Sequence, residues 1–212
     1  MNPEKQSPNN QNSIEFKRLF LGFSIPANQT ELLTALQQQL TPHLNSDAKA
    51  IAAENFHLTL LFLGGFPTAQ LPQLLTTIDT LRLALFNQTL TKLCFWPGPK
   101  ILCLKGEACP NLADLAEQVS TQLAPLIHNQ AHNPLIKEHC YTPHISLFRK
   151  VTRFNQHQAE PCLPERQINL APRELHLYES RSVNTEQNGK AQSSVRYQIL
   201  HSWPLMPMKS EA

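Results

Sequence analysis

Apolar positions recur along the chain with two different periods, which predict strands and helices in turn. Alternation over residues 55–63 and 142–151 predicts two strands. Apolar residues three and four positions apart predict helices over 28–43, 68–84 and 111–129. Other apolar stretches predict further strands at 17–25, 88–95, 100–105, 167–181 and 195–203.

Capping and breaking residues mark where these elements begin and end. Asn28 followed by Glu31 has the pattern of a capping box at the start of the first helix. Gly64-Gly65 is expected to end the strand that precedes it. Between the last two strands, the polar residues 183–194 are predicted to form a flexible connection.

The order of the elements predicts an α+β fold. Residues 1–15 are rich in Asn, Gln, Ser and Pro, and we expect them to be a disordered N-terminal extension. Residues 16–206 should form a single domain, and residues 207–212 a C-terminal tail. The repeat of one short motif suggests two related halves within that domain.

Composition narrows the class of protein without identifying it. The formal net charge of +2 over 212 residues is only mildly basic and does not identify a nucleic-acid binder. The five cysteines are irregularly spaced and contain no CxxC pair, so we expect a reducing, cytoplasmic environment. No secretory signal or apolar run of about 20 residues is visible, so no membrane association is expected.

The two alternating strands carry the same short motif. His57-Leu58-Thr59-Leu60 and His144-Ile145-Ser146-Leu147 both read histidine, apolar, hydroxyl, apolar. In an extended chain the imidazole and the hydroxyl share a face, roughly 7 Å apart, while the apolar pair faces a core.

Two imidazoles and two hydroxyls in one cleft could perform acid–base chemistry on a phosphodiester without a metal or cofactor. One neutral imidazole would take a proton from water, and the other, protonated, would give a proton to the leaving oxygen. Hydroxyl hydrogen bonds would stabilise the charge that develops on the phosphoryl oxygens. The pattern alone does not say which histidine is the acid, and a histidine on a half-buried strand is usually only hydrogen-bonded.

In their full context the motifs resemble those of the two-histidine phosphoesterase superfamily. The similarity is greatest to the RNA 2′,3′-cyclic phosphodiesterases, formerly called 2′-5′ RNA ligases. It is carried by Asn55–Gly64, by Tyr141–Arg149, by the opening Arg18-Leu19-Phe20 with Pro26, and by the closing segments Leu177–Ser180, Arg196-Tyr197 and Trp203–Leu205.

The resemblance implies a two-lobed fold with pseudo-twofold related antiparallel sheets, flanking helices and a cleft between the lobes. It implies hydrolysis of RNA 2′,3′-cyclic phosphate ends to 2′-phosphates, with His57 as proton donor and His144 as proton acceptor. Thr59 and Ser146 match the phosphate-contacting hydroxyls of the family. The expected ligand is RNA with a cyclic end or a small cyclic nucleotide. The sequence carries no signal for an oligomeric state, and a monomer is the default expectation.

Three further residues are candidates for substrate binding. Phe20 and Tyr141 could stack on a base, although core packing is the more common role for such a phenylalanine. Arg149 could contact a phosphate, but strict alternation would place it on the opposite strand face from His144.

Other histidines give weaker indications. A loose set of possible metal ligands matches no familiar zinc spacing and consists of His132, His139, Cys140 and His144. The histidines without a matching motif are expected at the surface: His43, His128, His157, His176 and His201.

Two alternatives remain open on the sequence alone. The first is ligation of 2′-5′ RNA ends, which is the same chemistry run backwards. The second is a non-catalytic module that binds RNA ends, for which two matched proton carriers would have no use.

Overall fold

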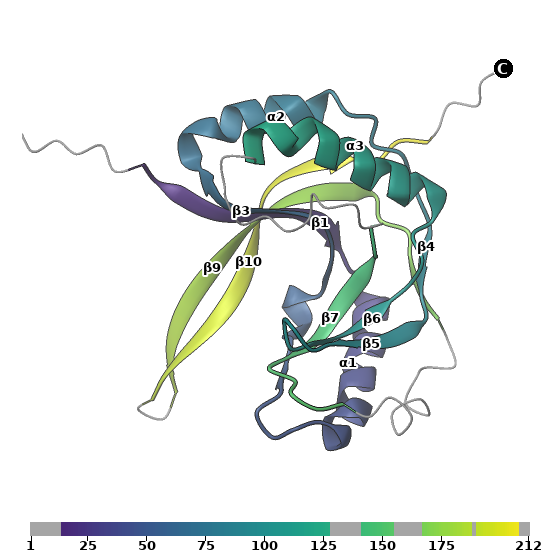
Figure 1. Cartoon of the computed structure of the whole chain (residues 1–212), viewed down its shortest axis with the longest axis vertical. Coiled ribbons are helices and arrows are strands. Elements are labelled where there is room, and N and C mark those ends of the chain that lie inside the picture. Colours follow the sequence, from purple (N-terminus) through teal and green to yellow (C-terminus); the bar gives the residue numbers. More distant parts are fainter. Residues whose placement is uncertain (1–13, 128–140, 155–166, 188–189, 208–212) are drawn as a thin grey trace, which may run out of the picture.

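The structure, a computed structural model, describes residues 14–127, 141–154, 167–187 and 190–207 (Figure 1). The predicted N-terminal extension and C-terminal tail therefore lie almost wholly outside the described residues. The described residues share one large cluster of buried apolar side chains.

Two four-stranded antiparallel sheets form the framework and confirm the predicted α+β class. The first sheet has the order β10 (Lys190–Pro204), β9 (Glu174–Gln187), β1 (Phe16–Ser24), β3 (His57–Pro67). The second has the order β2 (Lys49–Ala50), β7 (His144–Arg149), β6 (Ile101–Lys105), β5 (Lys92–Trp96). A separate two-stranded sheet consists of β4 (Gln88–Leu90) and β8 (Ile168–Leu170).

Three α-helices cover these sheets in the described residues: α1 (Ala27–Leu40), α2 (Leu71–Asp79) and α3 (Pro110–Ile127). All three were predicted, but α2 is shorter than the predicted range 68–84. Helices α2 and α3 pack together above the first sheet, whereas α1 contacts β7 of the second (Figure 1). The predicted capping box is wrong, because Pro26 occupies the N-cap position and Asn28 lies inside the first turn. Short 3₁₀ helices occur at Thr41–His43, Ala53–Asn55 and Thr68–Gln70.

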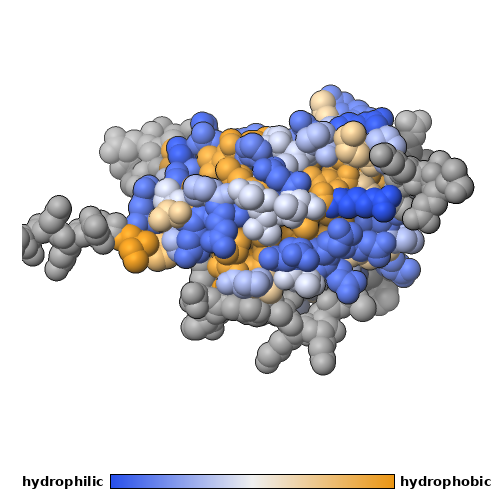
Figure 2. All heavy atoms as spheres, turned by 90° about the horizontal axis from the view of Figure 1, so that it is seen from above, coloured by the Kyte–Doolittle hydropathy of each residue, from blue (hydrophilic) through white to orange (hydrophobic). Residues whose placement is uncertain are grey.

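The surface above α2 and α3 shows hydrophobic strips separated by hydrophilic side chains (Figure 2). This mixture fits amphipathic helices that turn one face to the core and the other to water. Within the described parts of the chain, no helix is long and apolar enough to cross a membrane.

Strand β3 runs past the glycines that were expected to end it. Its pairing with β1 skips two residues, Leu60 and Leu63, and Gly64 has a φ of 70°. Each skipped residue is a β-bulge, which shifts the alternation of the side chains by one. Phe62 is therefore 45% exposed rather than buried as strict alternation predicts.

Strand β7 contains a bulge of the same kind. Phe148 pairs with Leu102, but the next pair joins Ser146 to Cys103, so Leu147 is the extra residue. Leu147 and Phe148 are both buried, and Arg149 is exposed. The bulge thereby places Arg149 on the same strand face as His144 and Ser146, and the expectation that it faces away is wrong.

Strands β9 and β10 form a long hairpin, part of which projects from the body of the molecule (Figure 1). The predicted flexible connection over 183–194 is wrong, because strand pairing continues to Gln187 and resumes at Lys190. The sequence does contain a signal for this hairpin in Asn188-Gly189, since Asn-Gly is strongly favoured in two-residue hairpin turns.

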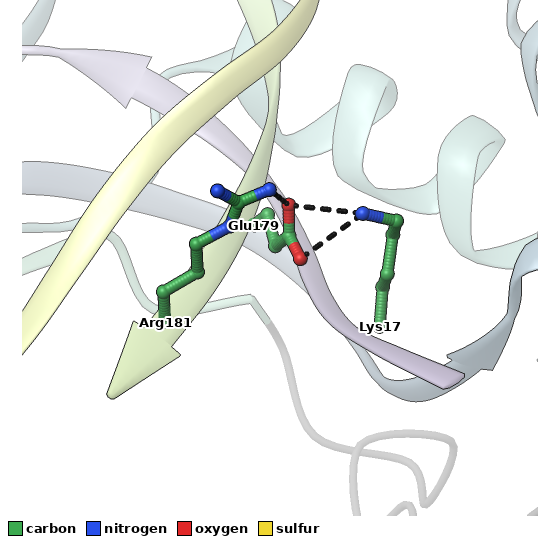
Figure 3. A network of polar contacts seen from close by, with 3 residues as sticks. All are labelled: Lys17, Glu179 and Arg181. Atoms are coloured by element: carbon green, nitrogen blue, oxygen red, sulfur yellow. Dashed lines mark hydrogen bonds and ion pairs between the residues drawn. The ribbon is translucent and has the colours of Figure 1, made fainter. Parts of the chain in front are cut away.

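A buried carboxylate joins the base of this hairpin to β1 (Figure 3). Glu179 is 8% exposed and accepts hydrogen bonds from Arg181 Nη2 at 2.7 Å and from Lys17 Nζ at 3.2 and 3.3 Å. The hydrogen bond from Arg181 is the main reason that the pKa of this carboxyl lies below its ordinary value of 4.5, and Lys17 lowers the pKa further.

Replacing this carboxylate tests its contribution to stability. At pH 7, Glu179→Gln is expected to lower the free energy of unfolding by about 1–3 kcal/mol. Because the pKa is depressed in the folded state, the stabilisation is present above pH 4.5 and is lost as the pH falls through the lowered pKa. Denaturant unfolding at pH 7 and pH 3 should therefore show a smaller difference between the two proteins at pH 3.

A matched control is Glu107→Gln, since the Glu107 side chain is 96% exposed and its ion pair with Lys92 spans 4.0 Å. This variant should unfold like the parent protein. Equal losses of stability at pH 7 for the two variants would contradict the assigned role of Glu179.

Candidate active site

The two motif histidines stand at the first positions of strands β3 and β7, and both are anchored in the same way. His57 Nδ1 lies 2.7 Å from the carbonyl oxygen of Asn55, and His144 Nδ1 lies 3.0 Å from that of Thr142. A carbonyl oxygen can only accept a hydrogen bond, so each Nδ1 carries the hydrogen and donates it. Each Nε2 is then the nitrogen that can gain or lose a proton in catalysis.

Aromatic rings hold both imidazoles in place. The ring of His57 lies 4.8 Å from that of Phe20 and meets the edge of Tyr197 at 4.9 Å, measured between centroids. The ring of His144 meets Trp96 in a T-shaped contact at 4.6 Å. These contacts limit the rotation of the imidazoles, so that each Nε2 has a defined direction.

The two histidines also interact electrostatically. Burial lowers the pKa of His57 to about 4, although the hydrogen bond to the Asn55 carbonyl acts in the opposite direction and raises the pKa. The positive charges of His144 and Arg149 lower it further, so these groups act on the same region. Burial is also the main cause that lowers the pKa of His144, and the Thr142 carbonyl opposes the shift.

The strands that carry the motifs belong to different sheets but contact each other. The Tyr141 hydroxyl, just before β7, donates a hydrogen bond of 2.6 Å to the backbone carbonyl of Thr59 in β3. Burial raises the pKa of this phenol, so it stays protonated and remains a donor. In the structure, Tyr141 thus links the two strands that carry the motifs. Its stacking on a base remains a prediction.

A second link between the sheets passes through Arg149. Its Nη2 donates a hydrogen bond of 2.7 Å to the hydroxyl of Tyr197 in β10, whose ring edge packs against His57. Arg149 is exposed, so its remaining N–H groups face solvent or a ligand. A cation thus lies within electrostatic range of His57, where a phosphate would need one.

The other predicted site residues differ in accessibility. Thr59 is 6% exposed and Ser146 is half-buried, each on the strand of its histidine. Phe20 is only 2% exposed and stacks on Tyr178 at 4.8 Å, which leaves little of its surface for a base. The structure places Phe20 beneath His57 as packing, the more common role considered from the sequence.

Sequence reasoning missed several members of the site. Tyr197 and Trp96 contact the two imidazoles, yet neither lies near a motif in the chain. Tyr197 belongs to a segment that resembles the closing strands of the family, which gave it no role in the site, and Trp96 directly follows the strand predicted over 88–95. His176 was expected at the surface but is 5% exposed, with Nδ1 2.7 Å from Ser202 Oγ and Nε2 3.3 Å from Ser24 Oγ.

The loose set of possible metal ligands cannot be placed, because only His144 among its members belongs to the described residues. Elsewhere in the described ranges, no group of three or more His, Cys, Asp or Glu side chains could hold a metal ion.

A buried glutamine on α1 supports the bulge that positions Arg149. Gln37 Nε2 donates to the carbonyl oxygens of Leu147 at 2.7 Å and Ile51 at 2.9 Å. Leu147 is the extra residue of the bulge, and its carbonyl also accepts from the Ile51 N–H at 2.8 Å. Gln37 therefore holds the backbone at Leu147, the point where the bulge shifts the alternation of the β7 side chains.

Removing this amide should weaken both the fold and the site. Gln37→Met keeps the approximate size but leaves buried carbonyls short of a donor, so the free energy of unfolding should fall by about 1–3 kcal/mol. Denaturant unfolding measures the loss. Gln38→Met is the control, because Gln38 is the next residue of α1 and is exposed. If both variants unfold like the parent protein, Gln37 does not support the bulge.

A pocket of about 520 Å³ adjoins His57 on the side of α1. Its walls come from the end of β1, the start of α1, the 3₁₀ turn before β3, and strands β9 and β10. Neither His144 nor Arg149 is among its lining residues. Its polar and aromatic lining includes Ser24, Glu31, Glu54, Tyr178 and Tyr197.

Known proteins provide an independent comparison. The family described as LigT like Phosphoesterase matches residues 23–102, which include His57 and Thr59 but not the second motif. No curated protein matches the chain.

Solved structures match over most of the chain. The structure of E. coli LigT in apo form has 25% identity and a TM-score of 0.69, and covers 90% of this chain and 98% of that one. E. coli LigT complexed with NADP+ gives 25% identity, a TM-score of 0.68 and coverage of 90% and 99%. TT0787 of Thermus thermophilus shares the fold, at 24% identity, a TM-score of 0.67 and coverage of 90% and 98%.

Proposed function

From the premise that this chain belongs to the LigT-like phosphoesterases of the two-histidine superfamily, we propose that it hydrolyses RNA 2′,3′-cyclic phosphate ends to 2′-phosphomonoesters. The observation that carries the proposal is the matched anchoring of His57 and His144. Both present Nε2, and the charge of one opposes protonation of the other. The complex of E. coli LigT with NADP+ supports a nucleotide ligand, since that protein is a structural relative.

In the proposed reaction, water attacks the phosphorus atom while His144 Nε2 takes its proton. A new P–O bond forms, the bond from phosphorus to O3′ breaks, and His57 Nε2 gives its proton to O3′. The product carries a 2′-phosphate and a free 3′-hydroxyl.

Three further groups would stabilise the negative charge that develops during this step. The hydroxyls of Thr59 and Ser146 donate hydrogen bonds to non-bridging phosphoryl oxygens, and the guanidinium of Arg149 supplies positive charge. Every proton transfer in this scheme uses a side chain of this chain.

The low pKa of His57 gives the bound phosphate a role in the reaction. At about 4, the pKa leaves His57 neutral in the ligand-free protein at pH 7. A phosphate anion held between the imidazoles favours their charged forms and raises the pKa of both. The substrate would thus help to protonate the acid that cleaves it.

Turnover of an RNA oligonucleotide ending in a 2′,3′-cyclic phosphate tests the proposal, with EDTA present. The expected product is a 2′-phosphate, identified by ³¹P NMR. A 3′-phosphate would contradict the assignment of O3′ as the leaving oxygen, and absence of turnover would favour a module that only binds RNA ends.

A second arm of this experiment adds RNA with a 5′-hydroxyl end. Hydrolysis should remain the main reaction in water. Product consisting mainly of joined RNA would make 2′-5′ ligation the working activity instead.

A further inference from the structure

The pocket on the α1 side of His57 has no part in the proton transfers proposed above. Its volume of about 520 Å³ lies within the usual range for small-ligand sites. Because His57 is one of its lining residues, the pocket adjoins the histidine that would give its proton to the leaving oxygen. The pocket is therefore placed to hold the part of the substrate that does not react.

One wall of the pocket is aromatic and apolar. Tyr178 stacks on Phe20, and Tyr197 is fixed by the hydrogen bond from Arg149 and by its contact with His57. Ile199, which also lines the pocket, is 46% exposed and so presents apolar surface that a ligand can cover. A planar nucleobase would cover the accessible part of this wall, which half-buried Tyr197 and exposed Ile199 provide, since bases stack on aromatic rings with little dependence on their identity.

The polar lining is rich in hydrogen-bond acceptors. Glu31 and Glu54 contribute carboxylates, and no Lys or Arg occurs among the described residues that line the pocket. Part of the donor capacity of the lining is already used, because the Thr30 hydroxyl donates to the Ile25 carbonyl and one N–H of the Asn55 amide donates to that of Val195. The environment favours an uncharged ligand that donates hydrogen bonds and disfavours a phosphate.

A fixed hydroxyl completes the polar lining. Ser24 Oγ lies 3.3 Å from Nε2 of His176, whose Nδ1 lies 2.7 Å from Ser202 Oγ. His176 is 5% exposed and does not line the pocket, so this buried side chain holds the Ser24 hydroxyl in place. Ser24 also pairs with His57 between β1 and β3, which places the two residues side by side.

Charge is thus distributed unequally around His57. Arg149 acts on His57 but does not line the pocket, whereas the two carboxylates line it. A cyclic nucleotide has the same polarity, with an anionic phosphate at one end and a neutral base at the other.

We propose that the pocket is a nucleoside subsite that selects bases with a donor edge, with guanine the best fit. The inference rests on the proposed function and specifies its substrate. Guanine presents N1–H and an amino group side by side, which a carboxylate can accept together. Uracil presents one N–H between two carbonyl oxygens, and a carboxylate repels those oxygens.

Calorimetric titration with reaction products tests the subsite without requiring turnover. The probes are 2′-GMP, 2′-UMP and inorganic phosphate. We expect 2′-GMP to bind about 10-fold or more tightly than 2′-UMP, and phosphate to bind most weakly. The Glu31→Gln, Glu54→Gln double variant should bring the two nucleotide affinities close together, whereas Glu107→Gln should preserve the difference.

Obstructing the pocket provides a second measurement that does not depend on the carboxylates. Ala53 and Ala27 line it and are exposed, so Ala53→Trp and Ala27→Trp can each fill it from a different wall without replacing a core residue. Each folded variant should lose about 10-fold or more in affinity for 2′-GMP and much less for inorganic phosphate. Equal affinity of the parent protein for 2′-GMP and 2′-UMP, or undiminished 2′-GMP binding in both tryptophan variants, would overturn the proposal.

These outcomes separate the subsite from the reaction. Cyclic phosphates that are bound with the expected base preference but not hydrolysed would contradict the proposed function alone. Hydrolysis with no preference among bases and no effect of the tryptophans would contradict the subsite alone.

Discussion

Replacing either His57 or His144 with alanine is expected to lower kcat/KM for a cyclic-phosphate RNA end by about 10²–10⁴-fold. Each substitution removes the group that performs one of the two proton transfers. The measurement is initial-rate kinetics with EDTA present. Each variant should also lose one limb of a bell-shaped pH profile, because only one ionising group of the pair remains.

The double variant and a remote histidine make this prediction more specific. His57→Ala with His144→Ala should cost far less than the product of the two single losses, because the residues act as a unit. His201→Ala is the matched control, since His201 is exposed, belongs to neither motif and packs its ring against Trp203. Undiminished activity in either single variant of the pair would contradict the acid–base assignment.

Replacing Arg149 with leucine is expected to have the next largest effect, a loss of about 10²-fold in kcat/KM. The guanidinium charge lies within electrostatic range of His57, and its hydrogen bond holds Tyr197 against that imidazole. Arg149→Lys keeps the charge but not the planar geometry, so it should recover part of the loss.

The same substitution should move a pKa in a known direction. The charge of Arg149 lowers the pKa of His57, which lies at about 4, so Arg149→Leu should raise it. NMR titration of the His57 ring measures the shift. Arg153→Leu, which removes an exposed cation four residues further along the chain, should leave the pKa of His57 in place. An unchanged pKa in Arg149→Leu would show that the guanidinium does not act on His57.

Local patterns predicted most of the elements because strand and helix periods are properties of short segments. The strands predicted over 88–95 and 167–181 are wrong in extent, because each is divided into two strands of different sheets, β4 and β5 in the first case and β8 and β9 in the second. The strands around His57 and His144 and the three helices occur where apolar spacing places them. The β-bulges could not be predicted in the same way, because each is a mismatch between two strands that are distant in sequence. The predicted orientations of Phe62 and Arg149 were wrong for that reason.

Residues of the site could be predicted only where they belong to a short sequence motif. His57 and His144 follow from their motifs, but Tyr197 and Trp96 reach them through sheet pairing that the sequence does not specify. Gln37 is one glutamine among several in α1, and only its burial against β7 distinguishes it. The hairpin of β9 and β10 is a different case, because the dipeptide Asn188-Gly189 in the sequence is one that favours hairpin turns.

The central claim is that one phosphorus atom lies between two imidazoles contributed by different sheets. Its most direct test is NMR titration of the His57 and His144 rings with and without 2′-AMP. The account predicts that the ligand shifts the resonances of both rings and raises both pKa values. If the nucleotide binds and either imidazole keeps its resonances and its pKa, the two histidines do not share a phosphate and the account is contradicted.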